Sequence, residues 1–305
     1  MKGGGETSHL RREEQNFYLI LLSPLVLVMC GFYMFPALYS LYLGLTNNSY
    51  LSTAAPTFIG LANFGRFFTS TSGQASIINT LWYVVLQVTL EMILGTLYAI
   101  LLNERFRFSG FFRTIMLLPI MIAPIVVAYE WRWLFNAQYG LINFILLSLH
   151  VISSPLAWLS NPRFAFYTMV VAGIWSGAPL VGLVLLGAMQ SVPEEVLEAA
   201  TMDNASGWAR LRYVVLPLIR PSFLAVLLIS TINAFQMFTL NYVMTYGGPG
   251  DRSLLLSLYA YEQAFQSFNI GYAAAIAMVA FAIMVSVGFI ISRLVGRQLA
   301  YKEGA

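Results

Sequence analysis

Charged residues are scarce in this chain of 305 residues. They make up 10% of the sequence, against about 25% in an ordinary soluble domain. The chain is 59% hydrophobic, so it cannot cover a soluble surface with polar groups, and this composition also excludes intrinsic disorder. A net charge of only +3 gives no case for a nucleic-acid partner. The composition therefore predicts an integral membrane protein whose apolar surface faces lipid.

Residues that carry common catalytic or metal chemistry are few as well. The single Cys30 excludes an internal disulfide, and His9 and His150 lack metal-ligand spacing, so we predict no metal site. Lys2 and Lys302 both lie in the tails, outside any G-x-x-x-x-G-K-[ST] loop of the kind that binds nucleotide phosphates. Hydrolase and zinc-protease signatures are absent from the sequence. We predict a chain that is not an enzyme and binds no cofactor itself.

Long apolar runs dominate the rest of the sequence. A helix needs about 20 mostly apolar residues to cross a bilayer, and six runs meet this length. They cover residues 17–45, 77–102, 114–135, 164–189, 218–244 and 271–294. Such continuous runs differ from the alternating strands of a membrane barrel. We predict an all-α polytopic membrane domain over 17–294, tails over 1–16 and 295–305, and a loop at 190–217.

The basic residues fall mainly on one side of the predicted spans. Twelve of the 16 lie in the two tails and in the loops after the second and fourth spans. These are Lys2, Arg11, Arg12, Arg105, Arg107, Arg113, Arg210, Arg212, Arg220, Arg293, Arg297 and Lys302; the other four are Arg66, Arg132, Arg163 and Arg252. Because cytoplasmic loops carry the excess of basic residues, both termini and the 190–217 loop should be cytoplasmic.

The 190–217 loop has the pattern of a helix, a turn and a second helix. Ser191 is a suitable N-cap, and Glu194 three residues later would complete a capping box. Good helix formers continue to Met202, and the Asp203-Asn204 pair should end the helix because Asn tolerates the left-handed conformation of a C-cap.

Ser206 can cap the second helix of this loop, which we expect to run to about Leu216. Pro217 and Pro221 should then break or kink the entry into the fifth span. From the residues alone, the segment is either a solvated linker or a docking surface. Its amphipathic content favours the docking surface.

The same loop resembles the EAA loop of permease subunits in binding-protein-dependent ABC importers. The family pattern is E-A-A-x3-G-x9-I-x-L-P. Here Glu198, Ala199 and Ala200 match the triplet, and Leu216 and Pro217 match the end. Val214 stands for the isoleucine, and Asn204 replaces the usual glycine, whose left-handed turn Asn can adopt.

Further motifs extend this resemblance along the chain. They are "FIGLANF" at Phe58–Phe64, "FRTIMLLP" at Phe112–Pro119 and "TYGGPG" at Thr245–Gly250. The likeness is to the maltose-type and glycerol-phosphate-type permeases. It implies a type I importer fold in a bacterial-type cytoplasmic membrane and import of a di- or oligosaccharide. It also implies a second permease, which we expect to be a different chain, two ATPase subunits that bind ATP and Mg, and an external sugar-binding protein.

By this resemblance, the first helix of the loop would insert into a cleft on an ATPase subunit. Glu198 would pair with a basic residue there, which would fix the register of the two surfaces. Apolar contact would come from Leu197, Ala200 and Met202. The coupling set is completed by Ala199, Asp203, Asn204 and Pro217.

Amides in the fifth span suggest a solute path. Asn233, Gln236 and Asn241 fall within one broad face of a continuous helix, with Met237 between them. Each amide offers a donor and an acceptor for sugar hydroxyls, although the same amides could instead join helices by hydrogen bonds. Aromatic candidates for the path are Tyr242, Trp175 and Trp133, which could equally belong to an interfacial belt or the core.

Glu91 lies deep in the second span, with Gln87 one turn before it. A carboxylate at mid-bilayer costs about 2.5–3.5 kcal/mol on insertion scales, so it should face protein or water. We favour a structural role or a contact with the partner permease. The alternatives are a stand-alone secondary transporter that uses Glu91, and an importer of a glycerol-phosphate-like solute. The lack of basic residues deep in the spans disfavours a phosphorylated solute.

Overall fold

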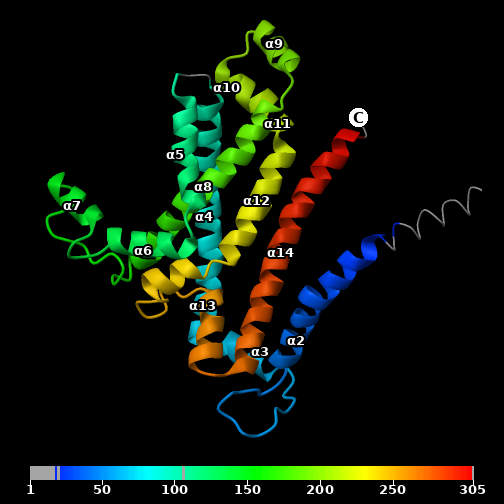
Figure 1. The fold of residues 1–305 in the computed structure, drawn as a ribbon, viewed down its shortest axis with the longest axis vertical. Coiled ribbons are helices and arrows are strands. Elements are labelled where there is room, and N and C mark those ends of the chain that lie inside the picture. Colours follow the sequence, from blue (N-terminus) through cyan, green and yellow to red (C-terminus); the bar gives the residue numbers. More distant parts are fainter. Residues whose placement is uncertain (1–17, 19–20, 105–106, 304–305) are drawn as a thin grey trace, which may run out of the picture.

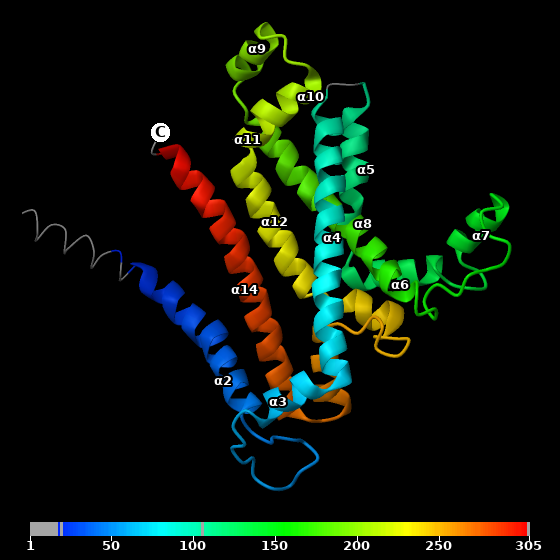
Figure 2. The same cartoon turned by 180° about the vertical axis from the view of Figure 1, so that it is seen from behind.

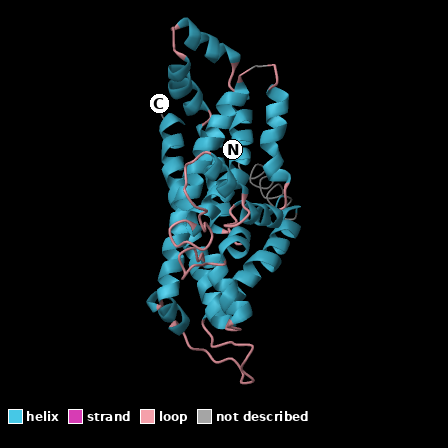
Figure 3. Cartoon of the chain, turned by 90° about the vertical axis from the view of Figure 1, so that its left-hand side faces the viewer, coloured by secondary structure: helices cyan, strands magenta, loops and turns pink. Residues whose placement is uncertain are grey.

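The computed structural model describes residues 18, 21–104 and 107–303, and this part of the chain is helical (Figures 1 and 3). Its only β pairing is an isolated bridge between Thr46 and Phe58. The predicted all-α fold is thus confirmed. The helices are η1 Cys30–Met34, α2 Phe35–Gly44, α3 Ala62–Thr69, α4 Thr71–Asn103, α5 Ser109–Met121, α6 Pro124–Leu134, α7 Leu141–Ser148, α8 Ala165–Gln190, α9 Glu194–Met202, α10 Gly207–Arg210, η2 Leu211–Val215, α11 Leu216–Leu218, α12 Arg220–Phe235, η3 Asn241–Thr245, α13 Leu256–Tyr261, η4 Glu262–Gln266 and α14 Ile270–Glu303.

Four helices are long and apolar enough to cross a membrane unaided. They are Leu21–Gly44, Thr71–Asn103, Ala165–Gln190 and Ile270–Arg293, close to the predicted first, second, fourth and sixth spans. The last helix continues to Glu303, past the predicted end of the membrane domain at residue 294. The predicted N-terminal tail, with Arg11 and Arg12, lies outside the described residues.

The predicted third span, 114–135, is wrong as a single straight helix. The chain forms α5 and α6, which meet at an angle of 100°. Ile122 and Ala123 are extended, with ψ angles of 132° and 137°. Pro124 explains this break, because a proline disfavours helical backbone at the residue before it.

The predicted fifth span, 218–244, is also not continuous. Helix α12 ends at Phe235, and only after an irregular stretch does η3 begin at Asn241. Backbone groups freed by the break need new partners in an apolar environment. Ser257 Oγ supplies one of them by donating a hydrogen bond to the Met237 carbonyl at 2.6 Å.

The two ends of the bundle differ. Helices α9, α10 and α11 project at one end, beside the junction of α4 and α5 (Figures 1 and 2). The long loop before α3, together with α3 and α13, lies at the opposite end (Figures 1 and 3). Asn63 anchors this loop by donating to the carbonyls of Gly44 and Thr46 at 2.9 and 2.8 Å.

Helices α4 and α8 pack closely in the middle of the bundle. A Cβ at Gly95 of α4 would lie 2.4 Å from Val181 Cβ and 2.9 Å from the Ala178 carbonyl of α8. Small residues are what allow helix backbones to approach in lipid, where apolar burial alone gives little drive for association. The contact therefore depends on Gly95 having no side chain.

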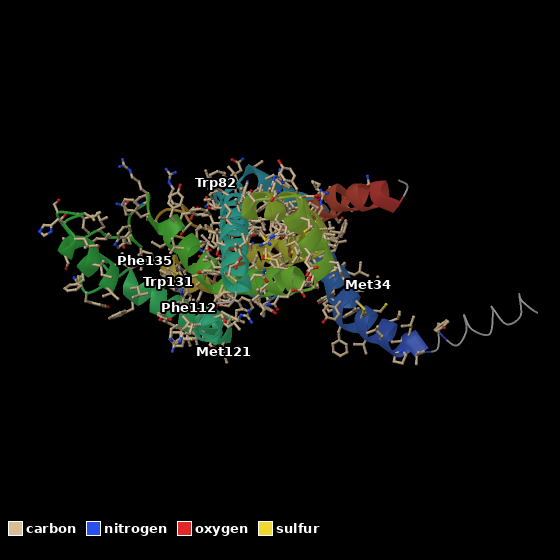
Figure 4. The ribbon with its side chains drawn as sticks, turned by 90° about the horizontal axis from the view of Figure 1, so that it is seen from above. Met34, Trp82, Phe112, Met121, Trp131 and Phe135 are labelled. Carbon is tan, nitrogen blue, oxygen red and sulfur yellow. The ribbon has the colours of Figure 1, made fainter. Side chains whose placement is uncertain are left out.

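The N-terminal span is different, because it leaves the bundle. None of its most apolar window, within Leu21–Gly44, is buried by the rest of the chain. Viewed from above, Met34 lies on this separate helix, whereas Trp131 and Phe135 lie at the other end of the molecule (Figure 4). The span contacts α14 at its Gly44 end and leaves the rest of its apolar surface to lipid or to another protein.

We predict that Gly95→Ala destabilises the fold, because the new methyl overlaps Val181. Overpacking of this kind costs about 1–3 kcal/mol. The midpoint of thermal unfolding in detergent should fall. Gly187→Ala is the matched control, since a Cβ at Gly187 of α8 meets no atom within 4 Å. If both variants unfold at the same temperature, the close α4–α8 contact is wrong.

Candidate functional site

We call the projecting segment, formed by α9, α10, η2 and α11, the elbow. The N-cap of α9 is Pro193, which makes no side-chain hydrogen bond to the helix. The predicted capping box is therefore wrong. Ser191 Oγ instead donates to the Ala188 carbonyl at 2.8 Å and so caps the preceding α8.

The turn after α9 follows the prediction for Asn204. This residue has a φ of 53°, in the left-handed region. Its N–H donates to the Thr201 carbonyl at 3.0 Å, and the N–H of Ala205 donates to the Ala200 carbonyl at 3.0 Å. This pair of bonds defines a Schellman motif, which usually places glycine at the left-handed position. Asn204 thus performs the conformational role of the glycine that it replaces.

The second half of the elbow begins at Ser206, whose Oγ accepts a hydrogen bond from the Ala209 N–H at 3.2 Å, as predicted. The helical segment continues through η2 and α11 to Leu218 and then bends by 73° into α12. The buried Ile219 forms the joint, and Pro217 and Pro221 flank it. The predicted proline break is confirmed.

The predicted coupling residues divide into two groups. Ala200 is only 8% exposed, and its contact with a partner stays a prediction. Met202 is 84% exposed and Leu197 is half-buried. Glu198, Ala199, Asp203 and Pro217 are exposed.

Further large side chains extend the apolar surface of the elbow. Trp208 is 70% exposed and Tyr213 is 77% exposed, although both lie on short helical segments. A cleft of about 340 Å³ separates this surface from the ends of α4 and α8, and Leu197 and Arg210 lie in its wall. The sequence analysis missed both aromatic residues. The available signal was their position on either side of Arg210 and Arg212, because a solvated linker does not require large aromatic side chains.

A largely apolar cavity of about 250 Å³, with a few polar side chains in its wall, lies halfway along the bundle. It occupies the corner where α5 and α6 break, between α4, α8 and the end of α12. Its polar lining comes from Gln87, Glu91, Ser176 and Asn233. The apolar lining includes Pro119, Ile122, Pro124, Val127, Leu180, Met237 and Leu240.

Two of the predicted path residues, Asn233 and Met237, line this cavity. Gln236 does not: it is exposed and caps the C-terminus of α12. The predicted common helical face of Asn233, Gln236 and Asn241 is wrong, because α12 ends before Gln236.

Asn241 is completely buried and holds the loop after η3. Its amide Nδ2 donates to the Ser253 carbonyl at 2.7 Å, and its Oδ1 accepts from the Leu255 N–H at 3.1 Å. Thr245 Oγ1 and the Met169 sulfur also lie within 3.2 Å of Nδ2. The hydrogen-bonding groups of the Asn241 side chain are therefore taken up by other residues of the same chain. This is the alternative considered for these amides, in which they join parts of the protein rather than bind the solute.

The predicted aromatic residues lie elsewhere. Tyr242 and Tyr246 line a separate cavity of about 560 Å³, with Arg132 and Trp158, beyond the C-terminal end of α6. Trp175 lines an apolar groove between α4, α5 and α8, and its ring contacts Trp131 edge-on at 5.8 Å. Trp133 is 52% exposed on α6 and lines none of these cavities. The structure thus distributes the aromatic candidates over several surfaces.

Two glycines of α8 make room for the polar cluster. A Cβ at Gly177 would lie 2.6 Å from the Glu91 carboxyl, and one at Gly173 would lie 2.8 Å from Gln87 Oε1. The Gly173-x-x-x-Gly177 spacing is a signal for close helix contact that was available in the sequence.

A helical membrane bundle with polar side chains in the wall of an internal cavity and an amphipathic elbow at one end is compatible with a membrane transport subunit. Comparison with known families agrees. Residues 91–301 match the family described as binding-protein-dependent transport system inner membrane component, and the chain belongs to this family. It is therefore a multi-pass inner-membrane transport component and not an enzyme.

Relatives of known name cover most of the chain. The trehalose/maltose transport system permease protein of Thermococcus litoralis is 33% identical over 92% of this chain and 94% of its own length. The trehalose transport system permease protein of Mycobacterium tuberculosis is 30% identical over 94% of this chain and 91% of its own length.

A solved structure shares the fold. It is a bacterial ABC transporter involved in the import of the acidic polysaccharide alginate, with a TM-score of 0.79 and 19% identity, over 96% of this chain and 99% of the matched one. At this identity the match speaks for the architecture alone.

We predict that Asn241→Ala loosens the loop after η3, because it leaves the buried Leu255 N–H and Ser253 carbonyl without partners. The loss is worth about 1–3 kcal/mol. Trypsin should then cleave several-fold faster after the exposed Arg252. Asn233→Ala, which removes an exposed amide on the preceding helix α12, is the control. Equal cleavage rates in the two variants would show that Asn241 does not hold the loop.

Proposed function

We propose that this chain is one permease subunit of an ATP-driven, binding-protein-dependent importer of a sugar, a di- or oligosaccharide. The elbow carries the proposal. It combines the EAA pattern, a left-handed turn at Asn204 and an exposed apolar surface at one end of the bundle. The names of the trehalose and maltose relatives support a sugar as the solute.

In this proposal, ATP and Mg are bound by two ATPase subunits at the cytoplasmic side. The elbow, the α4–α5 junction and the last turns of α14 lie at the same end of the molecule (Figures 1 and 2). Most of the basic residues in the described part lie at this end as well, which supports a cytoplasmic elbow and cytoplasmic termini. The opposite end would face the external binding protein.

Coupling would pass through the bend at Ile219. The elbow continues directly into α12, whose far end carries Asn233 and, just beyond it, Met237 in the cavity wall. A displacement of the elbow by closing ATPase subunits would therefore move one wall of the solute path. Glu198 and Met202 offer the charge and the apolar contact for that surface.

We predict that combined Glu198→Arg and Met202→Asp substitutions abolish coupling, because they reverse the charge and remove the apolar contact. ATPase activity of the purified complex, stimulated by the binding protein, should fall at least about tenfold, in line with the loss of an interface hot spot. Arg293→Glu, at an exposed position of α14 outside the elbow, is the charge-reversal control. Normal stimulation in the elbow variant, at unchanged expression, would contradict the coupling role.

A second permease subunit would explain the splayed N-terminal span. This span makes no buried contact with its own chain through its most apolar window. A path between two permeases also suits the cavity, which is bordered by broken helices rather than enclosed by a complete ring of spans. We propose that the second permease is a different chain and that the N-terminal span packs against it.

We predict that cysteines on this span crosslink to the second permease. The native Cys30 and, in Cys30→Ala chains, Leu27→Cys and Phe32→Cys sample different sides of the helix. A photoactivatable maleimide should give a product that contains peptides of the second permease from at least one of them. Ala99→Cys, at a buried site on α4, is the control that should not react. Products with lipid alone from all three positions would contradict this contact.

A further inference from the structure

The cavity halfway along the bundle carries one acidic group. Glu91 is 3% exposed, lines the cavity and accepts hydrogen bonds through both carboxyl oxygens. Ser230 Oγ donates to Oε1 at 2.9 Å, and Gln87 Nε2 donates to Oε2 at 3.4 Å. Both neighbours are neutral donors. They orient the carboxyl group without supplying an opposite charge.

Within the described part of the chain, no basic side chain lines this cavity. Arg113 and Arg132, the nearest arginines along α5 and α6, donate to the carbonyls of Leu102 and Val243 and do not line it. The field of a carboxylate inside a protein is screened less than that of a fully solvated one.

The protein leaves one polar atom of the cavity wall unpaired, and another that lies beside the wall near Gly173. Gln87 Oε1 and Tyr83 Oη have no hydrogen-bond partner, although Gln87 is 3% exposed and Tyr83 is fully buried. Both lie at Gly173, where a Cβ would meet them at 2.8 and 2.7 Å. Buried polar groups normally have partners, and an unpaired amide oxygen calls for a donor.

We propose that Glu91 selects the solute by charge, so that the path admits neutral polyhydroxyl compounds and rejects anionic saccharides. This inference rests on the proposed function. Hydroxyl groups can donate to Glu91 and to Gln87 Oε1. A carboxylate or phosphate of a solute offers only acceptors to the same atoms and is repelled by Glu91. Two like charges roughly 6 Å apart at an effective dielectric constant of about 20 change a dissociation constant about a hundredfold.

The fold by itself does not determine whether a neutral or an anionic solute is admitted. The alginate transporter shares the architecture, yet its described solute is an acidic polysaccharide. The difference must then lie in side chains of the path. Glu91 occupies a position from which one carboxylate affects every solute that enters the cavity.

The test measures solute binding to the complete complex in detergent, without nucleotide and without the binding protein, which would impose its own specificity. Saturation-transfer NMR would follow trehalose and trehalose 6-phosphate, which differ by one anionic group. The unaltered complex should bind trehalose at least about tenfold more tightly than the phosphate, as the Coulomb repulsion requires.

Glu91→Gln should bring the two dissociation constants within about threefold, because it removes the charge and keeps the shape. Glu130→Gln, an exposed carboxyl on α6 outside the cavity, should leave the preference unchanged. Asn233→Asp adds a second carboxylate at an exposed position of the cavity wall and should strengthen the preference. If Glu91→Gln fails to fold, equal binding of the two solutes by the unaltered complex still overturns the proposal.

Equal binding of both solutes by the unaltered complex, or an unchanged preference in both cavity variants, would overturn charge selection by Glu91. The importer function would still stand if the same preparation hydrolyses ATP on addition of the binding protein. A preparation that contains no ATPase subunit would overturn the proposed function and this inference together.

Discussion

The close contact between α4 and α8 determines where the rest of the molecule can lie. Lipid provides little hydrophobic drive for helix association, so the helices approach through small residues. Gly95 admits Val181, while Gly173 and Gly177 admit the polar side chains of α4. The space that the two α8 glycines release is the space that Gln87 and Glu91 occupy. The face of α8 that allows close packing against α4 is therefore also the face that borders the proposed solute path.

The apolar environment of the bilayer also limits where the two spans can be broken. Non-helical backbone at membrane depth persists only where it is buried in protein or borders a polar cavity. Both breaks lie at such a place, because Ile122 at the α5–α6 bend and Met237 beyond α12 line the cavity that contains Glu91. Helix α12 is joined at its other end to the elbow. One helix thus connects the surface that would receive the partner's movement with the wall that the solute would meet.

Local sequence chemistry predicted much of this structure. The four unbroken spans follow from apolar length, and the left-handed Asn204 and the cap at Ser206 follow from turn chemistry. Features that depend on contacts between residues far apart in the sequence could not be predicted in this way. Pro124 signalled a possible break, whereas the end of α12 at Phe235 has neither Pro nor Gly nearby and depends on Ser257 from a distant segment. The role of Asn241 was unpredictable for the same reason, because its partners lie in the loop that it holds.

The central claim is that this chain acts only as part of an ATP-driven assembly coupled through its elbow. Purification from native membranes in mild detergent, with mass spectrometry of every co-purifying protein, tests it most directly. The account predicts an ATPase with a nucleotide-binding loop and a second permease that carries its own EAA segment. Recovery of the chain alone from several mild detergents, with solute transport retained after reconstitution, would contradict it.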